Sequence, residues 1–152
     1  MPRTSSHGDV PVVSFPHYHV CSNLKCGKLF DFRENFDLNR YLRFGVTCPE
    51  CQRQAYPARF VTICENGHMD DFPWRWWVHK GNDSCKGTLR MYSTGSSSTL
   101  SDIWVACSCG CKRSMSGATQ RDNFYGFKCS GYHPFRPKHK CEICDKDAIP
   151  SQ

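Results

Sequence analysis

Residues 21–26 read CSNLKC and residues 48–51 read CPEC, so two close cysteine pairs lie 21 residues apart. Four thiolates complete a tetrahedral zinc shell, and two tight turns can bring them together without a large hydrophobic core. The spacing therefore predicts one structural zinc site. Its expected ligands are Cys21, Cys26, Cys48 and Cys51. Four buried free cysteines, or a redox-active pair, are the alternatives.

The composition of the whole chain also favours metal binding. Twelve of the 152 residues are cysteine and seven are histidine. No stretch approaches the roughly 20 apolar residues of a membrane span, and residues 1–20 lack the apolar run of a secretory signal. We therefore expect a cytoplasmic protein, in which reduced thiols favour zinc over disulfides.

A second set of ligands lies between residues 64 and 85. Two cysteines and two histidines are a common structural zinc shell, and Gly67 permits a tight turn after the first cysteine. The expected ligands are Cys64, His68, His79 and Cys85. Alternatively, His79 packs beside its tryptophan neighbours at the end of a helix.

Two other features of this region have two interpretations each. Asp70 and Asp71 would either cap the following helix or support a ligating imidazole, and capping is favoured. The tryptophans would either pack in a small core or stack on nucleic acid bases, and packing is favoured. These tryptophans are Trp74, Trp76 and Trp77.

Six cysteines compete for a third site. In CSCGC, residues 107–111, Gly110 marks the turn after Cys109, which favours Cys107 and Cys109 as one pair. The expected ligands are Cys107, Cys109, Cys129 and Cys144. Cys111 and Cys141 are then left over and remain alternative ligands, and a two-metal cluster would use all six thiols. The three sets together predict about three Zn²⁺ ions per chain.

Regular structure is expected to be short, because 11 glycines and nine prolines interrupt the chain. We expect a small irregular α+β fold, in which zinc-ribbon-like knuckles carry short strands and one or two short helices. Residues 1–9 are polar and expected to be disordered, and residues 10–152 would form one zinc-binding module. Helices are expected within residues 32–44, within 70–81 and from Ser114. Strands are expected at 58–63, 88–92 and 103–105.

Basic residues are concentrated in KCSGYHPFRPKHK, residues 128–140, although the formal net charge of the chain is only +6. Cations neutralise phosphates and interleaved aromatic rings can stack on bases, so the segment predicts weak, non-specific DNA binding. The expected contacts are Lys128, Arg136, Lys138 and Lys140. A solvated loop is the alternative.

Five strings of residues are more specific than the spacing of ligands. They are VPVVSFPHYHVC (10–21), RFVTICENGHMDDFPWRWWVH (59–79), GSSSTLSDIWV (95–105), CGCKRSMSGA (109–118) and CSGYHPFRP (129–137). In this order they closely resemble the DrmB family of the DISARM antiphage defence system and related helicase-associated proteins. Members of that family are much longer, so the resemblance implies a segment of a longer protein.

The resemblance implies a non-catalytic partner of a superfamily 2 helicase-like protein, the pair binding DNA during defence against phage. It also implies that the eight expected ligands from Cys64 to Cys144 match recurrent positions of the family. Cys111 and Cys141 depart from the family pattern, which leaves the third site open.

An enzyme is the main alternative class. It would need an open metal position or a nucleophile beside a base, whereas each expected shell has four protein ligands. Neither a GxxxxGK[ST] phosphate loop nor a G-x-S-x-G elbow is present. We therefore expect no catalytic activity. A metal- or cysteine-dependent enzyme acting on nucleic acid, and a purely structural protein interaction module, remain the alternatives.

Overall fold

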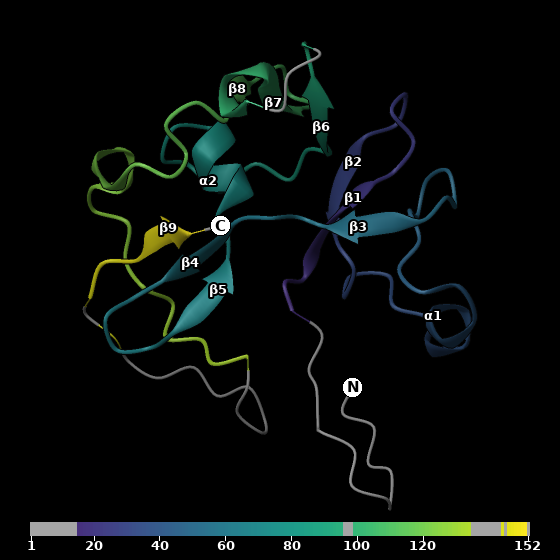
Figure 1. Ribbon diagram of the computed structural model, residues 1–152, viewed down its shortest axis with the longest axis horizontal. Coiled ribbons are helices and arrows are strands. Elements are labelled where there is room, and N and C mark those ends of the chain that lie inside the picture. Colours follow the sequence, from purple (N-terminus) through teal and green to yellow (C-terminus); the bar gives the residue numbers. More distant parts are fainter. Residues whose placement is uncertain (1–14, 96–98, 135–143, 145, 152) are drawn as a thin grey trace, which may run out of the picture.

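The computed structural model describes residues 15–95, 99–134, 144 and 146–151. Two antiparallel sheets carry the fold, as Figure 1 shows. The larger sheet has the order β3-β1-β2-β6-β7-β8 and the smaller has the order β5-β4-β9. Because all pairs are antiparallel, short turns join neighbours such as β1 and β2 or β7 and β8.

The elements are short throughout. The strands of the larger sheet are β1 (Tyr18–Cys21), β2 (Lys28–Asp31), β3 (Ala55–Pro57), β6 (Leu89–Ser93), β7 (Ile103–Cys107) and β8 (Lys112–Ser114). Those of the smaller sheet are β4 (Val61–Ile63), β5 (Met69–Asp71) and β9 (Ile149–Ser151). The helices are α1 (Leu38–Phe44) and α2 (Trp74–Val78), with 3₁₀ turns η1 (Leu100–Asp102) and η2 (Arg121–Phe124).

The expected fold class is confirmed. The described residues form two short helices and nine short antiparallel strands, and their clustered cysteines fit zinc-ribbon-like knuckles. None of the helices in this part of the chain is long and apolar enough to cross a membrane. The predicted boundary between residues 1–9 and the zinc-binding module lies outside the described residues.

Two of the expected helices differ from the structure. α1 is shorter than the range 32–44, because the Asp37 side chain caps it by accepting hydrogen bonds from the backbone N–H groups of Asn39 and Arg40, at 3.0 and 3.2 Å. The helix expected from Ser114 is wrong. Ser114 instead ends β8, where it pairs with Trp104. Gly117 then turns the chain with a φ of 77°, which does not continue a helix.

An aromatic core surrounds α2. Trp74, Trp77 and Phe72 are buried there, and Trp77 stacks on Phe124 with ring centroids 5.5 Å apart and an interplanar angle of 9°. Aromatic side chains of this size bury the most apolar area per residue and dominate the energetics of a small core. Trp74 and Trp77 therefore pack inside the protein and present no free face to nucleic acid bases.

A buried polar contact joins the two sheets. Asp71 of β5 accepts hydrogen bonds from the backbone N–H of His17 at 2.7 Å and of Tyr18 at 3.1 Å. Its other oxygen lies 2.7 Å from His17 Nδ1, and the Tyr132 hydroxyl lies 3.3 Å from His17 Nε2. Asp71 is therefore not a helix cap, and that expectation is wrong. The N-cap of α2 is Pro73, without a side-chain hydrogen bond.

Candidate metal centres

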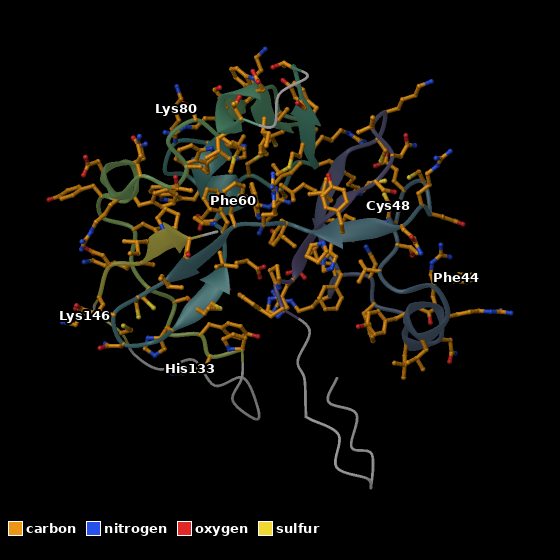
Figure 2. The ribbon with its side chains drawn as sticks, viewed as in Figure 1. Phe44, Cys48, Phe60, Lys80, His133 and Lys146 are labelled. Atoms are coloured by element: carbon orange, nitrogen blue, oxygen red, sulfur yellow. The ribbon has the colours of Figure 1, made fainter. Side chains whose placement is uncertain are left out.

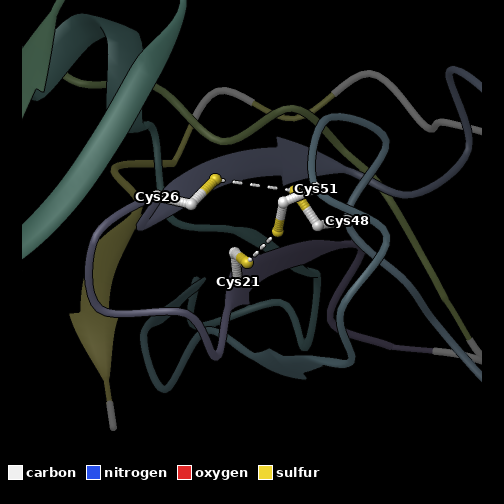
Figure 3. Close-up of side chains that lie close together, drawn as sticks. All are labelled: Cys21, Cys26, Cys48 and Cys51. Carbon is white, nitrogen blue, oxygen red and sulfur yellow. Dashed lines mark hydrogen bonds between the residues drawn. The ribbon is translucent and has the colours of Figure 1, made fainter.

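Four cysteines from two turns meet at the end of β1, in what we call site 1 (Figure 3). Cys21 Sγ lies 3.2 Å from Cys51 Sγ, and Cys26 Sγ lies 3.8 Å from Cys48 Sγ. Zn–S bonds of about 2.3 Å place the sulfurs of a tetrahedral shell about 3.8 Å apart. The Cys26–Cys48 distance matches this value, the Cys21–Cys51 distance is shorter, and all four sulfurs lie within 4.8 Å of one another, close enough to share one ion.

Local hairpin geometry builds site 1. Cys21 ends β1, and Gly27, with a φ of 59°, allows the chain to turn into β2 directly after Cys26. The second pair lies in a turn closed by the isolated bridge between Thr47 and Gln54. Cys21 and Cys48 are buried with Phe30 in a small cluster separate from the aromatic core. Site 1 is thus the centre of its own part of the fold.

Neighbouring donors stabilise thiolates at site 1. The backbone N–H of Asn23 donates to Cys21 Sγ at 3.4 Å. The backbone N–H of Arg53, together with the thiol of Cys21, lowers the pKa of Cys51 to about 7, whereas burial raises the pKa of Cys21 to about 12. Four thiolates around Zn²⁺ carry a net charge of −2, and Arg90 lies beside them, with Nη1 3.5 Å from Cys26 Sγ. The surroundings therefore favour the charged, metal-binding form at Cys51, whereas burial opposes it at Cys21.

Site 2 consists of Cys64, His68, Cys129 and Cys144. Cys64 directly follows β4 and His68 directly precedes β5, so the hairpin turn presents both ligands on one side. His68 Nδ1 lies 3.2 Å from Cys64 Sγ, which lies 4.0 Å from Cys144 Sγ. The backbone N–H of Gly131 donates to Cys129 Sγ at 3.3 Å. Cys64 and His68 are buried, so an ion would be largely shielded from water.

Site 3 consists of His79, Cys85, Cys107 and Cys109. Cys85 Sγ lies 3.7 Å from Cys107 Sγ, and His79 Nε2 lies 3.3 Å from Cys109 Sγ. The backbone N–H of Cys111 and the His79 ring lower the pKa of Cys109 to about 6. The ligand atoms of this site, like those of the other two, all lie within 4.8 Å of one another.

A hydrogen bond orients the His79 ring. Its Nδ1 lies 2.7 Å from the backbone carbonyl oxygen of Arg75, one turn back in α2. Since a carbonyl oxygen only accepts, Nδ1 carries the proton and Nε2 keeps its lone pair for a metal. The fold itself thus supplies the partner that a histidine ligand needs for the ring nitrogen away from the metal.

The ligands expected for the second and third sites are brought together in other combinations by the structure, so the expected grouping is wrong. Sequence order placed Cys64 and His68 with His79 and Cys85, whereas the structure brings them to Cys129 and Cys144. His79 and Cys85 instead meet Cys107 and Cys109. The reason lies in residues 69–78, which run as β5 and α2 through the aromatic core and separate the two pairs.

Strand pairing explains the observed grouping. β9 pairs with β4, which brings Cys144 close to Cys64. β6 pairs with β7 in a register that places Leu89 opposite Cys107, so Cys85, just before β6, reaches the end of β7. The second pairing had a visible signal. Two expected strands, 88–92 and 103–105, flank the Gly/Ser-rich sequence GSSS at residues 95–98 and predict a hairpin whose outer ends meet.

Of the remaining candidates, the structure places Cys111 and Lys128. Cys111 is exposed and belongs to none of the three groups, and Cys141 lies outside the described residues. Arg136, Lys138 and Lys140 also lie outside them. Lys128 is exposed, and its Nζ forms an ion pair with Asp147 at 2.7 Å.

A fourth group gathers His17, Asp70 and Asp71. The 2.7 Å between His17 Nδ1 and Asp71 Oδ2 is a hydrogen bond, and Asp70 Oδ2 accepts another from Ser130 at 2.7 Å. Because these donors already occupy the carboxylate oxygens, the group is explained as the contact between the sheets rather than as a metal site.

The chain has recognisable relatives among known proteins. The family described as "Domain of unknown function (DUF8724)" matches residues 1–152. The chain belongs to this family. It is also 49% identical over 150 residues to the DISARM protein DrmB of Bacillus paralicheniformis (strain ATCC 9945a / NCIMB 11709 / CD-2). The match covers 98% of this chain and 27% of that protein. It confirms the resemblance to DrmB, and the chain corresponds to about a quarter of that relative's length.

Proposed function

We propose that the chain is a non-catalytic zinc module of an antiphage defence protein, holding three structural Zn²⁺ ions. One observation carries the proposal: each of the three sites gathers four cysteine or histidine donors within 4.8 Å. Ten of the twelve donors are thiols, which favour zinc over hard cations such as Mg²⁺ and Ca²⁺. The DISARM protein similar to this chain supplies the defence context.

The ligand count separates a structural role from a catalytic one. A catalytic zinc site has three protein ligands and keeps a fourth position for water or substrate. Each of the three sites offers four protein donors, so a tetrahedral ion there has no open position. We therefore assign the zinc ions to folding, in which they hold turns that the small cores alone would leave poorly stabilised.

Native mass spectrometry of the purified chain tests the count, and zinc-edge X-ray absorption tests the shells. We expect three zinc ions, with an average shell of about 3.3 sulfur and 0.7 nitrogen neighbours from ten thiols and two imidazoles over three ions. An oxygen neighbour at one site, together with hydrolysis of a nucleic acid, would instead favour the enzyme.

We further propose that the module binds DNA weakly and works with a helicase-like partner. The partner rests on the resemblance to helicase-associated proteins. The DNA proposal rests on the basic residues of 128–140, of which the structure describes Lys128 as exposed. Because Asp147 pairs with Lys128, binding DNA would require the phosphate to compete with that carboxylate, which keeps the affinity low.

Fluorescence anisotropy with labelled single- and double-stranded DNA across a salt series tests this part. Replacing Lys128, Arg136, Lys138 and Lys140 by alanine removes up to four phosphate contacts, so the log–log salt slope should fall by about 3 on single strands. A control variant loses four exposed cations elsewhere, at Lys25, Arg53, Arg59 and Lys86. It should keep most of the slope. Equal slopes for the two variants would mean that residues 128–140 are a solvated loop.

A further inference from the structure

We propose that α1 and the turn before it form a surface on which two copies of this chain pair, antiparallel and about a two-fold axis. Eight large hydrophobic side chains are exposed among the described residues, and four of them lie within nine positions of one another. These four are Phe36, Leu38, Leu42 and Phe44, with exposed fractions of 40, 41, 54 and 53%. Clustering of this kind marks an interaction surface, whereas scattered exposed residues need no explanation.

α1 is amphipathic, but its apolar face is only partly used within the molecule. At 100° per residue, Leu38, Tyr41, Leu42 and Phe44 cover one side of the helix, and Asn39, Arg40 and Arg43 cover the other. None of the seven residues is buried. A helix whose apolar face stays in water lacks the packing that normally stabilises short helices. A second surface is therefore needed to cover it.

The exposed face is held in a fixed position. Tyr41 packs on Phe32 and Phe36, with ring centroids 6.5 and 5.5 Å away. Arg40 Nε donates to Thr47 Oγ1 at 2.7 Å, which ties the helix to the turn of site 1. Figure 2 shows Phe44 at the outer edge of the molecule, far from Phe60 in the body. The apolar side chains are thus presented to solvent by an anchored element.

The order of charges identifies the occupant as a second copy. Acidic residues come before the helix, at Glu34 and Asp37, and basic residues come within it, at Arg40 and Arg43. When two such segments pair antiparallel, the acidic end of each faces the basic end of the other. No ion pair involves Glu34 or Arg43 in the described part of the chain. The Arg43 guanidinium lies 5.7 Å from the centre of the Phe44 ring, so it is held at the edge of the apolar surface, where a carboxylate of the second copy would meet it.

The size of the surface sets the strength of pairing. Four half-exposed side chains per copy give an interface below the roughly 1,200 Å² of standard complexes. The dimer should therefore be weak and depend strongly on concentration. A self-complementary patch of this kind fits the isologous contact of a two-fold dimer, in which the same residues occur on both sides.

Sedimentation velocity of the zinc-loaded chain, from about 1 µM to about 1 mM, tests the proposal over the range of weak dissociation constants. We expect a monomer–dimer equilibrium. Leu42→Asp should raise the dissociation constant at least tenfold, because it places a charge in the apolar contact. Tyr125→Asp is the control, since Tyr125 is 95% exposed, directly follows η2 and belongs neither to α1 nor to any of the three sites. Both variants should keep the zinc content and circular dichroism of the original chain.

A charge exchange tests the antiparallel arrangement. Arg43→Glu and Glu34→Lys should each weaken the dimer, and the variant carrying both changes should recover it, because the exchanged charges again face each other. A chain that stays monomeric at every concentration overturns the proposal. So does a dimer that Tyr125→Asp disrupts and Leu42→Asp does not. Binding of the monomer to anionic phosphatidylserine vesicles through Leu42 would assign the surface to a membrane and would also overturn it.

Discussion

Sites 1 and 3 differ from site 2 in how much of the chain they close. In sites 1 and 3 the two ligand pairs are separated by 21 residues, from Cys26 to Cys48 and from Cys85 to Cys107. In site 2 they are separated by 60 residues, from His68 to Cys129. Closing the longer loop costs about 0.9 kcal/mol more chain entropy by the logarithmic rule. The cost is small, so loop length alone does not decide which pairs meet.

The two kinds of site also stand in different surroundings. Site 1 forms its own small cluster with Phe30, away from the aromatic core. Site 2 closes the loop that contains α2, site 3 and most of the aromatic core, and it holds β9 against β4. A metal in site 2 therefore fixes the ends of the larger unit, whereas a metal in site 1 fixes one hairpin and one turn.

Removing all metal should have the largest effect. Small domains whose ligand turns are held by zinc commonly unfold without it, because the binding free energy is folding free energy. We expect chelation to abolish the native circular dichroism and the cooperative thermal transition. If metal analysis shows an empty protein that keeps its circular dichroism and its thermal transition, the aromatic core suffices for folding and the sites are accessory.

Double variants test whether Cys64 shares a site with Cys144 or with Cys85. Serine is a poor zinc ligand at neutral pH, so Cys64→Ser should lose one of the three zinc ions. Adding Cys144→Ser should lose no further ion, because both residues belong to site 2. Adding Cys85→Ser instead should lose a second ion, because Cys85 belongs to site 3. Native mass spectrometry reads these counts directly, and the opposite result for the two pairs would restore the grouping by sequence order.

The close ligand pairs could be predicted from sequence because each is a local feature. A turn of one to four residues between two cysteines, or between Cys64 and His68, places both side chains on one side whatever the rest of the fold does. The strands near β6 and β7 and the brief helix at α2 were predicted for a similar reason, since hydrophobic patterning and turn residues act locally.

Which ligand pairs belong to the same site could not be predicted from spacing, because strand pairing decides it. The ten residues from Met69 to Val78 look like a short connection, but Phe72, Trp74 and Trp77 are drawn into the core and carry His79 away from His68. Likewise, Asp71 resembles a helix cap in sequence, yet β5 places its carboxylate against His17. In both cases a tertiary contact overrides a local preference.

A substitution at Gly87 should damage site 3 and leave the other sites intact. A Cβ atom on Gly87 would lie 2.5 Å from Cys107 Sγ and 2.7 Å from Ser108 Oγ. Gly87→Ala should therefore displace a ligand, with a cost of about 1 to 3 kcal/mol in unfolding free energy and weaker binding of one zinc. Thermal unfolding and competition with a chromogenic chelator measure the two effects.

Gly126→Ala is the matched control. Gly126 has a φ of 79° and no atom within 4 Å of an added Cβ, so its replacement introduces backbone strain of about 1 kcal/mol without touching a ligand. It should keep three tightly bound zinc ions. If Gly87→Ala keeps its zinc affinity while Gly126→Ala loses it, the steric account of site 3 is wrong.

The smallest effect is expected at Cys111, the thiol nearest in sequence to site 3 that the site does not use. Cys111 is exposed, its backbone carbonyl oxygen accepts from the Cys107 N–H at 2.7 Å, and its thiol interacts with the thiol of Cys109. Alanine keeps that carbonyl, so Cys111→Ala should retain all three zinc ions and change the unfolding free energy by less than about 0.5 kcal/mol.

Cys109→Ala should instead lose one zinc, because Cys109 Sγ lies beside His79 Nε2. Because the two residues lie two positions apart in one turn, both variants share any general effect of shortening a side chain there. If Cys111→Ala loses the ion and Cys109→Ala keeps it, Cys111 is the ligand and the turn must rotate when metal binds. Equal retention in both variants would mean that either thiol can complete the shell. Such an exchange fits site 3, because Cys109 and Cys111 are both exposed and lie in the same CSCGC turn.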